Sequence, residues 1–209
     1  MTTPGPDISI ALLTYNAGDL LRRGLENLRA QETSRTVEIV AIDSGSSDDT
    51  VALLREFDVR VIEIPNENFD FGATRDQLYQ ACAGTYIVNL SQDAIPADAH
   101  WLEHLLKPLI EDEGVAVSTG RSIPDPDRAH RQFPWEANGY FYFTRASKRF
   151  AARYGTGLSF ANSAVRRSVW EALRFDAQAI SEDLQFQQKL HATEHICAFP
   201  QDAPVLHHH

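Results

Sequence analysis

Residues 37–50 have the sequence VEIVAIDSGSSDDT, in which an apolar, β-branched run ends abruptly in polar residues that favour turns. A short apolar run bounded in this way is typical of a buried strand in a parallel sheet. Residues 8–16, ISIALLTYN, repeat the pattern, with Thr14, Tyr15 and Asn16 at the end of the run. Because ligands bind outside the carboxyl ends of strands in open parallel sheets, these polar residues are the first candidates for a site.

Apolar runs alternate with stretches of helical period along the chain, which favours an α/β, Rossmann-like fold with a mostly parallel central sheet flanked by helices. Strands are predicted at residues 8–13, 37–42, 59–64, 86–90 and 115–118. Helices are predicted to carry Leu21, Leu25 and Leu28, to follow a capping Asp48, to span about residues 72–83, and to run from Trp101 to Leu109 with Pro108 distorting the end. A chain of 209 residues suits one such domain.

Composition excludes several classes of protein. With 43% hydrophobic and 23% charged residues the chain is globular, and its net charge of -10 argues against a nucleic-acid binder. Cys82 and Cys197 lie far apart, without the spacing of a zinc site or a disulfide framework. No apolar run approaches the ~20 residues of a membrane span. We expect a cytoplasmic protein, and peripheral attachment to the inner face of the cell membrane through a missing C-terminal segment stays open.

Two aspartates at predicted strand ends are candidate ligand contacts. The carboxylate of Asp43 can accept a hydrogen bond from the imide N–H of uracil or thymine; the alternative is a turn at residues 44–47 with a capping Asp48. Asp93, after the strand at 86–90, can share a divalent ion with a diphosphate; the alternative is a turn aspartate before a helix. If Asp43 contacts the base and Asp93 the diphosphate, a nucleotide would bind at one edge of the sheet.

A pair of adjacent carboxylates, Glu182 and Asp183, opens a helical stretch after Ser181. The pair can cap the helix, where the dipole favours negative charge, or it can supply a general base that takes the proton of an acceptor hydroxyl. The spacing does not separate these two interpretations. Prolines and aromatic residues are frequent in residues 124–154, an irregular segment to which we assign acceptor recognition.

Motifs of other enzyme classes are weak or missing. The sequence has no G-x-x-x-x-G-K-[ST] phosphate loop and no G-x-G-x-x-G after the first strand. Residues 157–161, GLSFA, only partly match the nucleophile elbow of a hydrolase. A sugar nucleotidyltransferase would need a glycine-rich, basic loop for a triphosphate after Thr14, and the sequence has no such loop there. A non-catalytic module that binds a nucleotide or a glycan remains the chief alternative from another class.

The ordered motifs resemble those of the inverting glycosyltransferases of the GT-A fold, of the family 2 type. Leu13-Thr14-Tyr15-Asn16, the block at residues 43–50 and Glu182-Asp183 are similar to the nucleotide-binding and base motifs of that family. Within it, the chain resembles the bacterial rhamnosyltransferases, which act in polysaccharide biosynthesis for the cell envelope. That likeness rests on FGATR at 71–75, SQDAIP at 91–96, Gly120-Arg121 before Pro124, and residues 159–167.

The resemblance implies a role for each matched residue. Asp183 would be the general base, and Asp93 would bind Mg²⁺ or Mn²⁺ as the remaining carboxylate of a D-x-D motif, with Ser91 in the first position. His207 would be a second metal ligand; it opens a run of three histidines, which is shorter than a usual purification tag, so we interpret it as native. Arg75 would meet the diphosphate, although Asp76 replaces the usual asparagine after it. The residues expected to contact the donor are Thr14, Tyr15, Asn16, Asp43, Ser44, Gly45, Arg75, Ser91, Gln92 and Asp93.

Residues 1–209 would then form one catalytic domain, with a nucleotide-sugar half at 1–96 and an acceptor-binding and catalytic half at 97–209, and a C-terminal extension missing from this sequence is possible. The implied reaction moves a sugar from a nucleotide diphosphate to a hydroxyl of a glycan or a lipid-linked glycan, with inversion. The preferred donor is dTDP-L-rhamnose. A UDP-hexose transferase of the same fold is the alternative.

Overall fold

The computed structural model describes residues 5–123, 125, 158–178 and 181–207. The segment assigned to acceptor recognition, residues 124–154, therefore lies outside the described residues except for Asp125.

Seven strands form the central sheet in the order β3-β2-β1-β4-β8-β6-β9. The first four positions are parallel, β8 runs antiparallel to β4 and β6, and β9 is parallel to β6. The mostly parallel α/β sheet confirms the predicted fold class. The strands are β1 (Ile8–Thr14), β2 (Val37–Asp43), β3 (Arg60–Glu63), β4 (Tyr86–Leu90), β6 (Val115–Thr119), β8 (Asn162–Arg166) and β9 (Ile196–Ala198).

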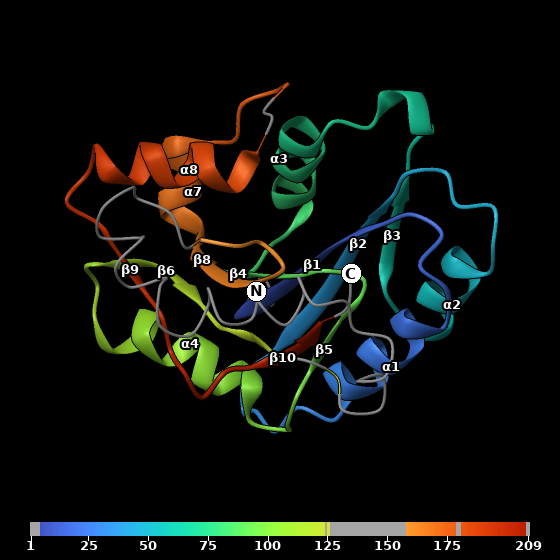
Figure 1. Cartoon of the computed structure of the whole chain (residues 1–209), viewed down its shortest axis with the longest axis horizontal. Coiled ribbons are helices and arrows are strands. Elements are labelled where there is room, and N and C mark those ends of the chain that lie inside the picture. Colours follow the sequence, from blue (N-terminus) through green and yellow to red (C-terminus); the bar gives the residue numbers. More distant parts are fainter. Residues whose placement is uncertain (1–4, 124, 126–157, 179–180, 208–209) are drawn as a thin grey trace.

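Helices cover both faces of this sheet (Figure 1). On one face α1 (Gly18–Arg29), α2 (Thr50–Glu56) and α4 (Trp101–Glu111) bury a core that includes Leu21, Leu25 and Leu28 against β1. On the other, α3 (Phe71–Ala81), α7 (Arg167–Leu173) and α8 (Glu182–His191) pack a second core around Tyr79 and Trp170. The two apolar layers account for the uninterrupted apolar runs of the central strands, because each strand is covered on both sides.

A smaller sheet, in the order β5-β10-β7, lies beside the main one. It joins β5 (Ala94–Pro96), β10 (Val205–His207) and β7 (Ser122–Ile123). Its register sets His207 opposite Ala94, directly after Asp93. Segments more than a hundred residues apart therefore meet at the carboxyl end of β4.

The predicted strands agree with the observed ones to within one or two residues, whereas β5, β7, β8, β9 and β10 were not predicted. Asp48 accepts the N–H of Thr50 at the start of α2, but the N-cap position itself is occupied by Asp49, whose side chain makes no capping bond. Pro108 does not end α4, which continues to Glu111. A proline in the last turn removes a single intrahelical hydrogen bond, so the apolar face of α4 decides the length of the helix.

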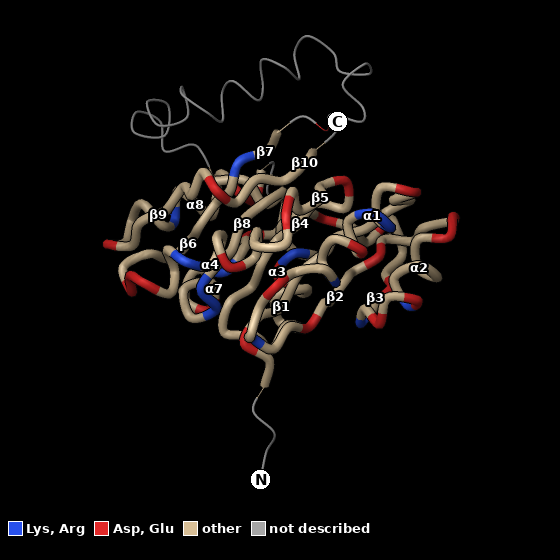
Figure 2. Tube along the Cα trace, turned by 90° about the horizontal axis from the view of Figure 1, so that it is seen from below, with Lys and Arg blue, Asp and Glu red and all other residues tan. Residues whose placement is uncertain are grey.

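Charge and cysteine usage also agree with expectation. Cys82 and Cys197 are free thiols. Figure 2 shows Lys and Arg dispersed over several elements among the acidic residues, without a continuous basic stripe in the described part of the chain. No helix within the described ranges is long and apolar enough to cross a membrane.

Candidate active site

A cavity of about 390 Å³ opens at the carboxyl ends of β1, β2 and β4. It lies at the edge of the sheet where the sequence predicts a site. Most of the predicted contacts line it, and it also draws on the loop before α3, on the turn before β8 and on the start of α8. The lining residues are Leu13, Thr14, Tyr15, Ser44, Asn66, Phe69, Phe71, Arg75, Leu90, Ser91, Gln92, Asp93, Ser159, Phe160, Ala161, Glu182 and Asp183.

Asp43 is 1% exposed, and both of its oxygens accept hydrogen bonds from the end of β1 and from the turn that follows β2. One oxygen accepts the hydroxyls of Thr14 at 2.9 Å and Ser46 at 2.6 Å, and the other accepts the N–H groups of Gly45 and Ser46. Gly45 has a φ of +83°, where a side chain would be strained. Asp43 and Gly45 thus shape the wall without lining the cavity, and contact between Asp43 and a base stays a prediction.

Asn16 and Gln92 tie the loops after β1, β2 and β4 together. Asn16, at a φ of +44°, donates its N–H to Ser46 and accepts the N–H of Ser47 at 2.9 Å. The side-chain amide of Gln92 accepts the N–H of Tyr15 at 2.8 Å and donates to its carbonyl. These bonds fix the backbone of Tyr15 while its ring, in a residue 47% exposed, faces the cavity. Asn16 itself does not line the cavity.

Asp93 and His207 lie together, as predicted for a metal pair. Nε2 of His207 is 3.1 Å from Oδ1 of Asp93, which also accepts the hydroxyl of Ser91. Burial alone would raise the pKa of Asp93, but the hydrogen bond and charge of His207, with the Ser91 hydroxyl, hold that pKa below its ordinary value. The Asp93 side chain is 31% exposed, so the carboxylate can still be reached from the cavity.

The pair suits a divalent cation. A carboxylate and an imidazole are ordinary ligands of Mn²⁺, and neighbouring ligands of an octahedral ion at about 2.1 Å lie about 3 Å apart, close to the Asp93–His207 separation. Among the described residues no cluster of three His, Cys, Asp or Glu side chains surrounds this point. The remaining ligands would have to be water and phosphate oxygens, which is the usual arrangement for a metal ion on a nucleotide.

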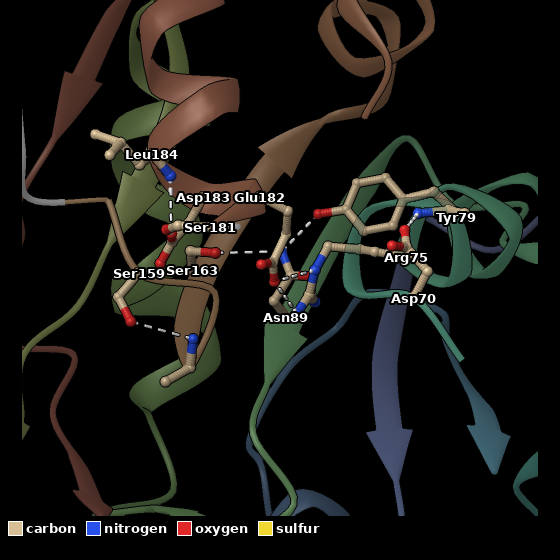
Figure 3. A network of polar contacts seen from close by, with 12 residues as sticks. Asp70, Arg75, Tyr79, Asn89, Ser159, Ser163, Ser181, Glu182, Asp183 and Leu184 are labelled. Atoms are coloured by element: carbon tan, nitrogen blue, oxygen red, sulfur yellow. Dashed lines mark hydrogen bonds and ion pairs between the residues drawn. The ribbon is translucent and has the colours of Figure 1, made fainter. Parts of the chain in front are cut away.

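Arg75 lines the cavity and forms an ion pair that the sequence did not predict (Figure 3). Its Nε and Nη2 donate to Oε1 of Glu182 at 3.1 and 2.8 Å, and Nη1 donates to Oδ1 of Asn89 at 3.0 Å. The guanidinium also lies 4.8 Å from the centre of the Phe160 ring. Three of its five N–H groups are therefore used within the protein, which leaves two for a ligand.

Asp183 differs from its neighbour Glu182. Its Oδ1 accepts the hydroxyl of Ser181 and the N–H of Leu184, both close in sequence, and it makes no ion pair with any residue that the structure describes. It lines the cavity at the N-terminus of α8. Glu182 is neutralised by Arg75, so the geometry distinguishes two carboxylates that the sequence alone left equivalent.

Several lining residues were missed from the sequence. Asn66 and Phe69 come from the loop before α3, and Phe71 is the first residue of that helix; the richness of this stretch in Asn and Phe was the available signal. Ser159 comes from the segment considered as a nucleophile elbow, but strand β8 follows it in place of the helix that an elbow requires. The hydrolase alternative therefore loses its only motif.

Comparisons with known proteins show the family to which the chain belongs. The family described as "Glycosyl transferase family 2" matches residues 9–174. The O-antigen chain rhamnosyltransferase WbaN of Salmonella anatum is 30% identical over 98% of this chain and 67% of its own length. RfbN of Salmonella typhimurium, also an O-antigen chain rhamnosyltransferase, is 29% identical over 97% of this chain and 66% of its own length. The chain thus spans about two thirds of these relatives.

Solved structures share the fold at lower identity. The mannosyltransferase PcManGT from Pyrobaculum calidifontis, in complex with GDP-Man and Mn²⁺, superposes with a TM-score of 0.74 at 18% identity, over 98% of this chain and 57% of its own. Glucosyl-3-phosphoglycerate synthase from Mycobacterium tuberculosis, with Mn²⁺, UDP and phosphoglyceric acid, gives 0.71 at 19%, over 98% and 72%. The chain belongs to glycosyl transferase family 2, has the GT-A fold, and is similar to rhamnosyltransferases.

Proposed function

We propose that residues 1–209 form the catalytic domain of an inverting glycosyltransferase, with donor binding in residues 1–96 and acceptor binding and catalysis in residues 97–209. The observation that carries the proposal is that one cavity is lined by both Asp93, paired with His207, and Asp183. With a divalent cation, Asp93 and His207 suit the diphosphate of a donor. The carboxylate of Asp183 suits the proton of an acceptor hydroxyl.

The proposed reaction is a single displacement. Asp183 takes the proton of the acceptor hydroxyl, whose oxygen forms a bond to the anomeric carbon while the bond from that carbon to the diphosphate oxygen breaks. Attack from the side opposite the leaving group inverts the configuration. Asp93 and His207 would hold Mg²⁺ or Mn²⁺, which supplies positive charge for the leaving diphosphate. The two remaining N–H donors of Arg75 would bind the same group.

The preferred donor is dTDP-L-rhamnose, and the acceptor a hydroxyl of a glycan or a lipid-linked glycan. Similarity to two O-antigen chain rhamnosyltransferases supports the sugar. Asp43 would select the pyrimidine. We place the protein in the cytoplasm, where a lipid-linked acceptor would bring it to the inner face of the membrane. UDP-hexose transfer is the alternative within the fold.

Donor turnover tests the proposal. Purified protein with Mg²⁺ or Mn²⁺ should release dTDP from dTDP-L-rhamnose, faster with a glycan acceptor, and chelator should stop the release. Clear activity with a UDP-hexose and none with dTDP-L-rhamnose would make the sugar assignment wrong. Binding of a nucleotide sugar without turnover under any acceptor would instead favour a non-catalytic binding module.

A further inference from the structure

The ion pair between Arg75 and Glu182 joins residues 107 positions apart, on α3 and on the first turn of α8. The two side chains are 9% and 12% exposed, which makes this pair far more buried than the Arg22–Glu56 pair between α1 and α2, at 47% and 56%. A buried ion pair is costly to desolvate, and removal of one partner leaves an uncompensated buried charge. The location of this pair beside the proposed base suggests that it fixes a geometry there.

Arg75 is itself held by a buried polar network on the sheet side of α3 (Figure 3). Asn89, fully buried in β4, accepts from Arg75 and donates its amide to the hydroxyl of Tyr79 at 2.5 Å and to that of Ser163 in β8 at 3.2 Å. Burial raises the pKa of Tyr79, so the phenol stays neutral in this network. The guanidinium is therefore fixed to the two central strands of the sheet, and it provides Glu182 with a rigid partner.

The segment that precedes α8 is hydrogen-bonded to α3 and its N-cap at two further points. Asp70, the N-cap of α3, accepts the N–H of Gln178 at 2.9 Å. Asp76, the residue after Arg75, accepts the N–H of Phe175 at 3.3 Å and Nε of Arg174 at 2.9 Å. Side chains of α3 and its cap thus hold the segment before α8, and Glu182 is the contact nearest to Asp183.

We propose that Glu182 is a positioning residue, which binds Arg75 and thereby fixes the rotation of the first turn of α8 so that Asp183 faces the cavity. The proposal rests on the proposed function of Asp183 as base. Successive residues of a helix point about 100° apart, so anchoring Glu182 to α3 determines where Asp183 points. A base misplaced by about 1 Å can cost about 10²-fold in rate, which gives the pair a reason to be rigid.

Substitutions of graded severity test this role. Glu182→Gln keeps an oxygen that can accept from Arg75, so we expect it to lose only about 3–30-fold in kcat. Glu182→Ala removes the anchor, and we expect a loss of about 10²-fold in kcat with the donor dissociation constant changed less than about 3-fold. Glu56→Ala, which breaks the exposed Arg22–Glu56 pair, is the matched control and should leave kcat unchanged. Thermal melts establish that each variant is folded; if Glu182→Ala is not, the Gln variant decides.

A double mutant and a spectrum complete the test. If the pair acts as one unit, Arg75→Ala with Glu182→Ala should lose no more kcat than Arg75→Ala alone. The Arg75 Nε–H resonance in ¹H–¹⁵N spectra, assigned by its loss in Arg75→Lys, should be protected in the wild type and shifted in Glu182→Gln. This signal needs no turnover, so it reports the anchor even if the wild type proves inactive and the proposed function fails.

Three results would overturn the proposal. Glu182→Gln as inactive as Asp183→Asn would make Glu182 a catalytic group. Normal kcat in a folded Glu182→Ala would reduce the pair to a contact of the fold. A raised donor KM with unchanged kcat would assign Glu182 to donor binding instead.

Discussion

The two walls of the cavity satisfy their carboxylates in different ways. On the wall built by the loops after β1 and β2, Asp43 is 1% exposed and accepts four hydrogen bonds from its own chain. On the wall built by the end of β4 and the start of α8, the Asp93 side chain is 31% exposed. Among the residues that the structure describes, Asp183 accepts only from Ser181 and Leu184, which lie beside it in sequence.

This difference indicates that the carboxylate of the first wall has a structural role and that those of the second wall have a chemical one. A carboxylate whose oxygens accept bonds from the end of a neighbouring strand and from its own turn holds that turn in place, and a ligand reaches it only by replacing one of those bonds. A carboxylate with an open oxygen can hold a cation or take a proton. Substitutions on the second wall should therefore change turnover or donor affinity while the protein stays folded. Substitutions on the first wall should mainly lower the free energy of unfolding.

The largest effect is expected at Asp183. Asp183→Asn keeps the size of the side chain and removes its proton affinity, so turnover should fall by about 10²–10⁴ while donor affinity stays the same. Transfer rates and donor calorimetry measure the two quantities. Normal transfer by Asp183→Asn together with an inactive Glu182→Gln would make Glu182 the base. Full activity in both variants would refute the proposed mechanism.

Asp93 should come next. Asp93→Ala removes the charged member of the pair with His207, and donor affinity in Mg²⁺ or Mn²⁺ should fall at least about 10–100-fold, since loss of even an outer-sphere partner typically costs that much. Calorimetry with and without chelator checks this, and His207→Ala should act in the same direction. If Asp93→Ala binds donor and metal like the wild type, Asp93 is a turn residue only.

A smaller and different effect is expected on the first wall. Asp43→Asn replaces an oxygen with an N–H donor among four donating groups, and should lower the free energy of unfolding by about 1–3 kcal/mol. Denaturant melts measure that loss. Calorimetry with dTDP, UDP and GDP then shows whether Asp43 also selects a pyrimidine: a preference for dTDP or UDP that disappears in the variant supports base contact, and equal affinities in the wild type would refute it.

The same two walls differ in how much of them the sequence revealed. The strands of the first wall are apolar runs followed at once by polar turns, so both the fold and the loops after β1 and β2 followed from local pattern. The second wall depends on β8, whose sequence NSAVR is too polar and short to predict as a central strand. The partners Arg75 and Glu182 lie 107 residues apart, and no periodicity relates them. Asp93 and His207 were predicted together only through the family resemblance.

Asp76 offers the most specific test, because it replaces the asparagine that usually follows Arg75 in the family and does not line the cavity. Its side chain is 16% exposed and binds Arg174, with Trp170 Nε1 at 3.0 Å. Asp76→Asn should therefore lower stability at pH 7 by about 1–3 kcal/mol and leave kcat within about 2-fold. Donor contact through Asp76 would instead appear as a change in the donor dissociation constant.

The pH dependence identifies the cause of that loss. Burial opposes ionisation of Asp76, but the hydrogen bonds from Arg174, Gln80, Trp170 and the backbone outweigh it and lower its pKa. A folded-state pKa below the unfolded value of about 4 contributes stability that is complete above pH 4 and is lost as the pH falls through the folded pKa. The gap between wild type and Asp76→Asn should thus be widest near neutral pH and shrink below about pH 4, whereas Asp58→Asn, at a side chain 94% exposed, should show no measurable gap at either pH. An Asp76 gap that persists unchanged at pH 3 would mean that the shape of the side chain, and not its charge, fastens α3 to the segment that carries the base.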